Sequence, residues 1–501
     1  MKTWNRWLPA LCPVLLAAWS GFAVWFFFSR GWLLYYGDAE AHLNIARRVL
    51  DSQTPGYDQF GTVWLPLPHA LMLPFVRIDA LWRSGLAGAI PSALCFITAG
   101  TFLFAAARRV FDSAAAATAA VGLFAGNPNL LYLQSTAMSE AVSFACLMAL
   151  LYCSVRFRET RGWGAAAGAG VACALGTLTR YEAWFLIPFV TVYFLFSAKR
   201  HRVAVAALFA VVAVLGPAYC MAHNWWLTGD ALDFYRGPYS PKAIQGSTPY
   251  PGHGDWRLAW LYFHTAAQLC LGPGLVWAGL AGIVAGIVKR AFWPLLLLAL
   301  PGAFYVWSIH SAATPIFVPT LPPNSYYNTR YGLAVLPLLA LAAASLVSLV
   351  PRPARGAAAL LVIAAGTVYW AVHRSPESWI TWKESAVNSE GRRRWVHEAA
   401  EFLGPRYVRG SGILTSFGDL TAIYREMGIP LRETFTGDNG VPWLATVNRP
   451  DLFLWQEWAV VMGGDAAQSA INRAGRFGIH YRLEKMIVAR RSPVIEIYRR
   501  I

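Results

Sequence analysis

A short stretch near the N-terminus, GDAEAH, places three side chains capable of chemistry directly after an apolar run. Asp38, Glu40 and His42 fall within five positions there. A carboxylate can take a proton from a hydroxyl group, and His42, one helical turn from Asp38, can orient that carboxylate or a substrate hydroxyl. Charge close to a bilayer is costly, roughly 3 kcal/mol at its centre, so these residues predict a functional site. The alternatives are that Asp38 only caps a helix and that His42 is an ordinary interfacial residue.

A second stretch, NSYYNTRYGLAVLP, combines a guanidinium with tyrosines at the end of another apolar run. A guanidinium can bind a phosphate through two parallel hydrogen bonds, so Arg330 is the first choice for an anion clamp. Tyr327 and Tyr331 are expected to line a sugar or lipid pocket. The alternative is an arginine that extends from the span end to the interface among belt aromatics.

Two further charged positions lie within or between apolar runs. In LTRYEAWFLIP, Arg180, Tyr181 and Glu182 separate two runs and are secondary candidates for substrate binding. Their alternative role is an ion pair that holds the bundle together. Glu140 lies well inside a predicted span, about three turns down, and we expect it to pair with an inward-facing arginine or asparagine as structural support rather than in catalysis.

Composition identifies the elements that carry these residues as membrane helices. The chain is 56% hydrophobic and only 14% charged, whereas ordinary soluble proteins have roughly 25% charged residues. The N-terminal run from about residue 8 to 28 is long for a signal peptide and lacks a cleavage site, so it is expected to remain as a span. About eleven apolar segments follow from hydropathy, at 8–28, 85–107, 113–126, 130–155, 164–179, 183–198, 203–222, 272–288, 292–309, 332–350 and 356–373.

Charge distribution predicts the orientation. If the N-terminus is cytoplasmic, fourteen basic and two acidic residues lie in the inside loops, while the outward regions of residues 1–373 carry ten of each. Such an excess of Lys and Arg is the positive-inside signal, so we expect an integral membrane protein with its N-terminus in the cytoplasm. The net charge of +16 is therefore scattered over loops. A nucleic-acid partner is excluded on this ground, because nucleic acid requires one basic surface.

The outward regions define the predicted domain organisation. A transmembrane domain spans residues 1–373, with a first outer loop at 30–84 and a second, rich in Pro and Gly, at 223–271. The first loop is expected to contain an interfacial helix with Asp38 as its N-cap. Residues 374–501 alternate strand-like and helical runs and predict an extracytoplasmic soluble α/β domain.

The order of these elements resembles the GT-C superfamily of polyprenyl-phosphate-dependent glycosyltransferases. The resemblance is carried by a first span, an outward acidic stretch opening a helix (GDAEAH), and outward R-Y-E and N-x-R-Y elements, over roughly residues 1–350. It is greatest to the protein O-mannosyltransferase and aminoarabinose-transferase-like bacterial branch. The resemblance implies that Asp38 is the general base. Some members use a divalent metal with two adjacent acids, whereas Ala39 separates Asp38 from Glu40 here, so whether a metal is used stays open.

The chemistry of such an enzyme sets its partners. The donor is a sugar linked through phosphate to a membrane isoprenoid, and the acceptor is a hydroxyl of a protein, lipid or polysaccharide. A carboxylate deprotonates the acceptor hydroxyl, and a fixed guanidinium, here Arg330, stabilises the leaving phosphate. We therefore expect an inverting hexosyl or pentosyl transferase acting on the extracytoplasmic side. The alternative function is a polytopic transporter or lipid flippase.

Overall fold

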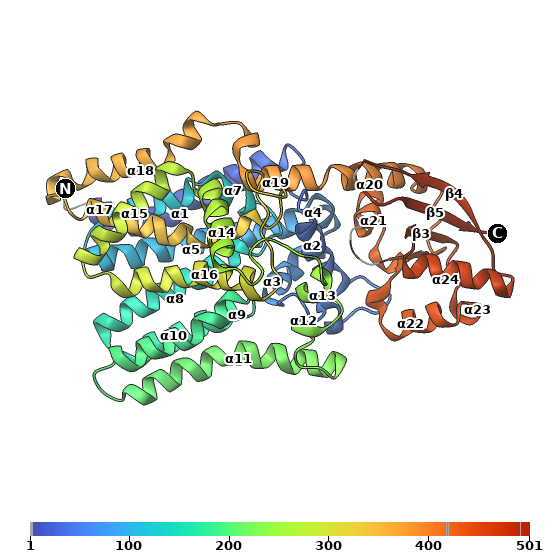
Figure 1. Ribbon diagram of the computed structural model, residues 1–501, viewed down its shortest axis with the longest axis horizontal. Coiled ribbons are helices and arrows are strands. Elements are labelled where there is room, and N and C mark those ends of the chain that lie inside the picture. Colours follow the sequence, from blue (N-terminus) through green and yellow to red (C-terminus); the bar gives the residue numbers. More distant parts are fainter. Residues whose placement is uncertain (1–3, 417, 419, 491) are drawn as a thin grey trace. The chain divides into compact units, whose positions relative to one another are not determined.

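The computed structural model describes residues 4–416, 418, 420–490 and 492–501, and it divides into two compact units (Figure 1). The first, which we call the membrane unit, comprises residues 1–30, 62–68 and 89–384. The second, the loop–tail unit, comprises residues 31–61, 69–88 and 385–501. Most of the first outer loop therefore belongs to the same unit as the C-terminal segment, residues 385–501.

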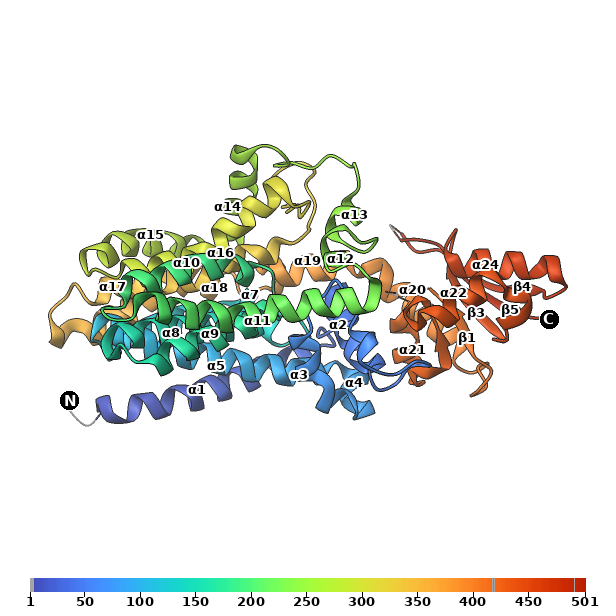
Figure 2. The same ribbon diagram turned by 90° about the horizontal axis from the view of Figure 1, so that it is seen from below.

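The membrane unit is a bundle of apolar helices that run alongside one another (Figures 1 and 2). Its helices are α1 (Trp4–Phe28), α5 (Leu86–Phe111), α6 (Ala114–Ala125), α7 (Pro128–Gln134), α8 (Glu140–Thr160), α9 (Trp163–Thr177), α10 (Glu182–Ser197), α11 (Arg202–Thr228), α12 (Asp233–Arg236), α13 (Pro241–Gln245), α14 (Trp256–Leu271), α15 (Pro273–Val288), α16 (Phe292–Ser311), α17 (Leu336–Val347), α18 (Arg355–Val372) and α19 (Ile380–Asn388). Three 3₁₀ turns, η2 (Thr329–Val335), η3 (Arg352–Ala354) and η4 (Pro376–Ser378), complete it.

Each of the eleven predicted apolar segments contains a helix. Within the described residues, seven helices are long and apolar enough to cross a membrane, or eight if the bent pair α14 and α15 forms one span. That pair bends by 111° at Gly272, and Figure 2 shows α14 at an angle to the bundle. Helices α6, α9 and α10 are shorter apolar helices. The protein is an integral membrane protein, and the span count of eleven stays a prediction.

Glycines let the helices α15 and α17 approach closely. A Cβ at Gly282 would lie 2.1 Å from the Ala342 carbonyl oxygen, so no larger residue fits there. Ser345 of α17 also donates a hydrogen bond to the Gly282 carbonyl at 2.6 Å. Small residues of this kind replace the hydrophobic effect as the basis of helix packing in lipid.

The predicted segment 130–155 is interrupted, contrary to expectation. Helix α7 ends at Gln134 and α8 begins at Glu140. The hydroxyls of Ser135 and Thr136 donate hydrogen bonds to the Leu131 and Leu133 carbonyls, at 2.8 and 2.7 Å, and so provide partners for carbonyls at the end of the helix. Glu140 is consequently the first residue of a helix and not a residue three turns inside one.

The loop–tail unit contains a small sheet with helices on both faces. Its elements are α2 (Gly37–Arg48), η1 (Tyr57–Phe60), α3 (Leu67–Val76), α4 (Asp79–Ser84), α20 (Glu390–Leu403), β1 (Ile413–Thr415), α21 (Thr421–Met427), η5 (Leu431–Glu433), β2 (Thr434–Phe435), η6 (Gly437–Asn439), α22 (Val441–Asn448), α23 (Pro450–Phe453), β3 (Trp458–Met462), α24 (Ala466–Ala474), η7 (Gly475–Phe477), β4 (Tyr481–Ile487) and β5 (Ile495–Arg500). The strand order is β2-β1-β3-β5-β4, with β1 parallel to β2 and β3, and β5 antiparallel to β3 and β4.

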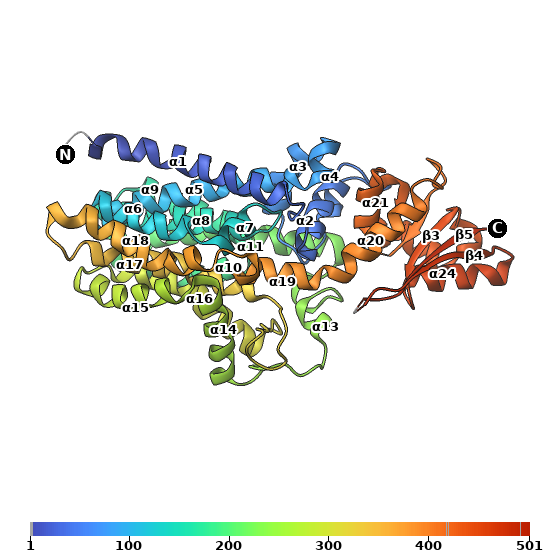
Figure 3. The ribbon, with the colours of Figure 1, turned by 90° about the horizontal axis from the view of Figure 1, so that it is seen from above.

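The central strand β3 is buried on both sides, which explains its uninterrupted apolar sequence WAVVM. Ala459 and Val461 pack with α24 and Trp443 of α22 in one core, and Figure 3 shows α24 alongside the sheet. Helix α20 lies next to β4. The predicted α/β character of the C-terminal segment is thereby confirmed.

Candidate functional site

Arg180 is the centre of a buried polar cluster in the membrane unit. Its Nε donates to Glu182 Oε1 at 2.7 Å, and its Nη1 donates to Glu140 Oε1 at 3.1 Å and to Ser139 Oγ at 2.9 Å. Its Nη2 donates to the Tyr305 hydroxyl at 2.6 Å. The predicted basic partner of Glu140 is confirmed, and the predicted pairing of Arg180 with Glu182 is also present.

Arg330 joins the same cluster from the other side of Glu140. Its Nε lies 3.3 Å from Glu140 Oε1, and its Nη1 lies 3.5 Å from Glu384 Oε1. One carboxylate oxygen of Glu140 is therefore shared by two guanidiniums. We call the five residues Glu140, Arg180, Glu182, Arg330 and Glu384 the arginine–carboxylate cluster; three carboxylates in it face two guanidiniums.

Glu384 holds the backbone that carries Arg330. Its two oxygens accept the Asn328 and Thr329 amides at 3.1 and 2.8 Å, and the Thr329 hydroxyl as well. Asn328 has a positive φ of 55°, a conformation that asparagine tolerates better than most residues. Glu384 is only 2% exposed. Its hydrogen bonds fix the strained turn directly before Arg330.

Helix ends place two of the carboxylates. Glu140 is the first residue of α8 and Glu182 is the first residue of α10. The partial positive charge at a helix N-terminus stabilises an anion there by about 0.3–1 kcal/mol. The break before α8 and the turn before α10 are thus the local features that put two carboxylates next to Arg180.

Tyrosines form the aromatic part of the site. The rings of Tyr305 and Tyr331 stack at a centroid distance of 4.5 Å. The Arg180 and Arg330 guanidinium carbons lie 5.3 and 5.1 Å from the centre of the Tyr331 ring. Both cations therefore have a π face as a neighbour, which restricts their orientation.

Four of the five cluster residues, all but Glu384, line a pocket. Glu140, Arg180, Glu182, Tyr305, Arg330 and Tyr331 contribute to its wall, together with Ser143, Phe144, Leu333 and Ala334. Its volume is about 20 Å³, room for about one water molecule. In the described part of the chain, Glu140 Oε2 is buried and has no hydrogen-bond partner. This carboxylate oxygen can accept a hydrogen bond from a bound ligand.

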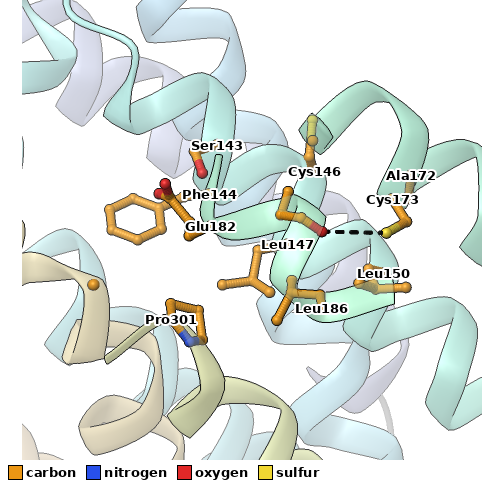
Figure 4. A pocket seen from close by; sticks show the side chains of 13 residues that line it. Ser143, Phe144, Cys146, Leu147, Leu150, Ala172, Cys173, Glu182, Leu186 and Pro301 are labelled. Carbon is orange, nitrogen blue, oxygen red and sulfur yellow. Dashed lines mark hydrogen bonds between the residues drawn. The ribbon is translucent and has the colours of Figure 1, made fainter. Parts of the chain in front are cut away.

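An apolar pocket adjoins the polar one (Figure 4). The two share Ser143, Phe144, Glu182 and Ala334. The apolar pocket lies among α8, α9, α10 and Pro301 of α16, with Leu147, Leu150 and Leu186 in its wall (Figure 4). The Cys173 thiol next to it donates to the Ala183 carbonyl at 3.9 Å. A polar and an apolar pocket therefore share part of their walls.

The first predicted stretch lies in the loop–tail unit. Helix α2 begins at Gly37 with Tyr36 as its N-cap, so Asp38 lies in the first turn and does not cap the helix as expected. Asp38 is partly exposed. Glu40 is 3% exposed and accepts hydrogen bonds from Arg425 and Asn44, at 2.7 and 3.1 Å.

His42 is buried and paired with a second histidine. Its Nδ1 lies 2.7 Å from Nε2 of His69, which is fully buried. Burial, followed by the nearby His42 and Arg48, holds the pKa of His69 well below its ordinary value. Helix α2 therefore buries most of its polar side chains, among them Glu40, His42, Asn44 and Arg47.

The remaining predicted residues lie around the membrane unit's polar cluster. The Tyr181 hydroxyl donates to the Val63 carbonyl at 2.7 Å, and its ring stacks on Phe234. Tyr327 pairs with Phe317 through its backbone, and its side chain is 45% exposed. Among the described residues, no group of three or more His, Cys, Asp or Glu side chains is arranged to hold a metal ion.

Two residues of this site, Glu384 and Tyr305, were not predicted from the sequence. Tyr305 lies within an apolar helix where nothing distinguishes it from a packing residue. Glu384 follows the last apolar run, in the stretch ITWKESAVN, and was assigned to the soluble tail. The sequence signal that could have indicated a buried Glu384 was its position between Trp382 and the small residues Ser385 and Ala386.

Comparison with known proteins gives one family match and several structural relatives. Residues 78–226 match the family of dolichyl-phosphate-mannose-protein mannosyltransferases. No curated protein sequence matches the chain. The crystal structure of ArnT from Cupriavidus metallidurans bound to undecaprenyl phosphate is similar over 97% of both chains, with 15% identity and a TM-score of 0.58. The apo ArnT structure is similar at 14% identity, with 97% coverage of both chains and a TM-score of 0.56.

A third structure is the apo oligosaccharyltransferase of Archaeoglobus fulgidus. It is 14% identical with a TM-score of 0.53, over 92% of this chain and 70% of that one. At such identities the likeness establishes the fold. The resemblance expected from the sequence is thus confirmed: the chain has the fold of the GT-C superfamily of membrane glycosyltransferases, and residues 78–226 carry the match to its protein mannosyltransferase family.

Proposed function

We propose that the protein moves a sugar from a polyprenyl-phosphate donor to an acceptor hydroxyl on the extracytoplasmic side of the membrane. The observation that carries this proposal is the arginine–carboxylate cluster lining a pocket inside a GT-C fold. Buried charge in a membrane bundle is expensive and is kept where it binds or reacts. The family match over residues 78–226 supports the same chemistry.

Arg330 and Arg180 are the proposed phosphate ligands. As the bond between the sugar and the phosphate breaks, the leaving phosphate gains charge, and a guanidinium held in place beforehand stabilises it. Glu140 and Glu384 hold Arg330, while Glu140 and Glu182 hold Arg180. Because the pocket has room for only about one water molecule, donor entry requires side chains such as Tyr331 to move aside.

The proposal that the donor carries an isoprenoid chain is supported by the apolar pocket beside the cluster. The apolar pocket beside the cluster offers a wall for the first isoprene units, and ArnT, which shares the fold, binds undecaprenyl phosphate in its crystal structure. We propose that Glu140 Oε2 accepts a hydrogen bond from a hydroxyl of the sugar. The acceptor is a protein, a lipid or a polysaccharide, and direct displacement at the sugar carbon would invert its configuration.

Asp38 is the proposed general base. It is the first acidic residue after α1, it lies in the first turn of α2, and it is partly exposed. An accessible carboxylate in that position can take the proton of an acceptor hydroxyl. Glu40 and His42 are buried, whereas Asp38 is partly exposed, so among the three predicted residues of this stretch Asp38 is the one proposed to react.

The test uses purified protein in liposomes with a panel of radiolabelled polyprenyl-phosphate sugars and a membrane extract as the acceptor source. We expect one donor to lose its label to an acceptor. Asp38→Asn should reduce this transfer by at least about 10³-fold, because the base is removed while size is kept. Asp58→Asn, in the same loop, is the matched control.

The outcomes separate the alternatives. Full transfer by the Asp38→Asn protein would remove the assignment of the base. Label that crosses the bilayer but stays on its lipid would show a flippase and overturn the proposed reaction. Unchanged thermal unfolding of the variant protein shows that lost transfer is not lost folding.

A further inference from the structure

Helix α2 is tied to the C-terminal segment by three ion pairs within the loop–tail unit. Glu40 pairs with Arg425 at 2.7 Å, Arg48 pairs with Asp438, and Asp51, just after the helix, pairs with Arg432 at 3.1 Å. The partners lie more than 380 residues apart in the sequence. On the α2 side, all three side chains are buried.

Hydrogen bonds extend this connection along the loop on both sides of α2. Arg392 of α20 donates to the Leu34 and Tyr35 carbonyls, at 3.1 and 2.6 Å, before the helix. After it, Gln59 donates to the Asp438 carbonyl at 3.0 Å, and Asn439 donates to Thr54 Oγ1 at 3.1 Å. The loop is therefore held by the C-terminal segment from residue 34 to residue 59.

Arg425 has the most direct position relative to Asp38. Its partner Glu40 lies two residues after Asp38, in the same first turn of α2. Arg425 also donates to the Arg83 carbonyl at 2.8 Å, which connects α4 to the same point. The pKa of Arg425 is raised because, although burial lowers it, the Glu40 carboxylate favours the charged form.

We propose that the C-terminal segment takes part in the reaction by positioning Asp38, with Arg425 as the principal positioning residue. This rests on the proposed function, because it assigns the reacting group to Asp38. A buried ion pair fixes orientation more than it adds stability. A first turn of α2 that is fixed in this way keeps the base in one place, and a displacement of about 1 Å costs a reaction roughly 10²-fold.

A charge exchange between Glu40 and Arg425 tests the proposal. Arg425→Glu and Glu40→Arg should each lower kcat by about 10²-fold, with the donor KM within about twofold, because the donor ligands lie in the other unit. The combined Glu40→Arg and Arg425→Glu protein should recover most of kcat, since the pair is restored with reversed signs. Arg425→Lys, which keeps the charge, should stay within about tenfold of the original.

The charge exchange between Glu40 and Arg425 also distinguishes a positioning role from substrate binding. If Glu40 contacts the substrate itself, reversing both charges cannot restore transfer, and that result would overturn the proposal. Arg449→Glu is the matched control, because Arg449 forms an exposed pair with Asp451 in the C-terminal segment. This control should leave kcat unchanged.

A second measurement does not depend on transfer. Hydrogen–deuterium exchange of the amides of residues 37–48 should rise in the Arg425→Glu protein and return to the original level in the combined variant. If Asp38→Asn retains transfer while these exchange changes occur, the proposed base is wrong but the holding of α2 stands. Unaltered exchange in Arg425→Glu would refute the positioning role whatever the activity shows.

Discussion

The arginine–carboxylate cluster of the membrane unit and the ion pairs of the loop–tail unit both bury charge, but they share it differently. In the cluster, one Glu140 oxygen serves both Arg180 and Arg330, and the other oxygen is without a partner among the described residues. In the loop–tail unit, Glu40, Arg48 and Asp51 each have an oppositely charged partner from the C-terminal segment.

This difference indicates two uses of buried charge. A cluster with an acceptor atom that has no partner, beside a pocket, can bind a ligand. The free energy spent on burying its charges is then offset by the interactions with that ligand. Ion pairs between distant segments define which segments meet, and these three pairs line neither of the two pockets. Substitutions in the cluster should therefore alter turnover more than stability. Substitutions in the pairs should mainly alter stability, except at the Glu40–Arg425 pair beside Asp38, where turnover is expected to change as well.

Among substitutions in the cluster and in the pairs, the largest effect on turnover is expected from Glu140→Gln. The change keeps the shape but removes the charge shared by two guanidiniums and the acceptor proposed for the sugar. We expect kcat/KM to fall by about 10²–10³-fold, as for the loss of one stabilising group at a reacting centre. The melting temperature in detergent should shift by only a few degrees.

Transfer kinetics and thermal unfolding measured on the same preparation check this prediction. Glu159→Gln is a suitable control, since Glu159 forms an exposed pair with Arg109 at the opposite end of α8. A protein that loses its fold while its turnover per folded molecule stays normal would assign Glu140 to structure, as the sequence first suggested.

Asp438→Ala should show the opposite balance. It leaves the buried Arg48 guanidinium without its carboxylate, and breaking one side of such a pair costs about 3–5 kcal/mol of stability. Replacing both residues by apolar ones, Arg48→Met with Asp438→Leu, should recover most of the loss. Chemical denaturation followed by the fluorescence of the C-terminal segment measures it, and an Asp438→Ala protein as stable as the original would contradict the comparison.

Glu384→Gln tests a residue that combines the two uses, because it lies in the cluster yet holds backbone. The amide can still accept the Thr329 N–H, but Arg330 loses one of its two carboxylates. We expect the donor KM to rise about tenfold with kcat within about threefold, since a loosened clamp weakens binding more than the chemical step. A fall in kcat at constant KM would instead place Glu384 in the chemical step.

Much of this arrangement could be predicted from the sequence where the signal is local. Hydropathy located most of the apolar helices but missed Leu67–Val76 and Trp256–Leu271, and an uninterrupted apolar run located the central strand Trp458–Met462. The edge strand β4 was missed, because the alternation in its sequence YRLEKMI stops after four residues, where the strand pairing is irregular between Leu483 and Lys485. The same locality explains why the interruption before Glu140 was missed: Ala137 and Met138 continue the apolar pattern through it.

What could not be predicted depends on partners distant in sequence. The polar residues of α2 form the pattern of a surface helix, and only the C-terminal segment, more than 380 residues away, shows that they are buried. Likewise, the pairing of Glu140 with an arginine was expected, but the choice of Arg180 and Arg330 was not. Hydropathy reflects only the free energy of burying each polar side chain by itself. Whether that free energy is offset depends on partners that the fold brings from distant parts of the sequence.

The smallest expected effect on stability comes from the pair of His42 and His69. It is seen in how the stability of the loop–tail unit depends on pH. His69 is fully buried against His42, and its pKa lies well below the ordinary 6.5 because of burial, His42 and Arg48. Below pH 6.5 the unfolded chain binds a proton at this position that the folded chain does not, so stability falls as pH decreases, by at most about 1.4 kcal/mol per unit. His69→Gln keeps a hydrogen-bonding side chain but has no such proton, and its stability should depend less on pH between 6.5 and 5. Melting temperatures of both proteins across that range measure the difference, and parallel curves would show that His69 is protonated in the folded protein as readily as in the unfolded one.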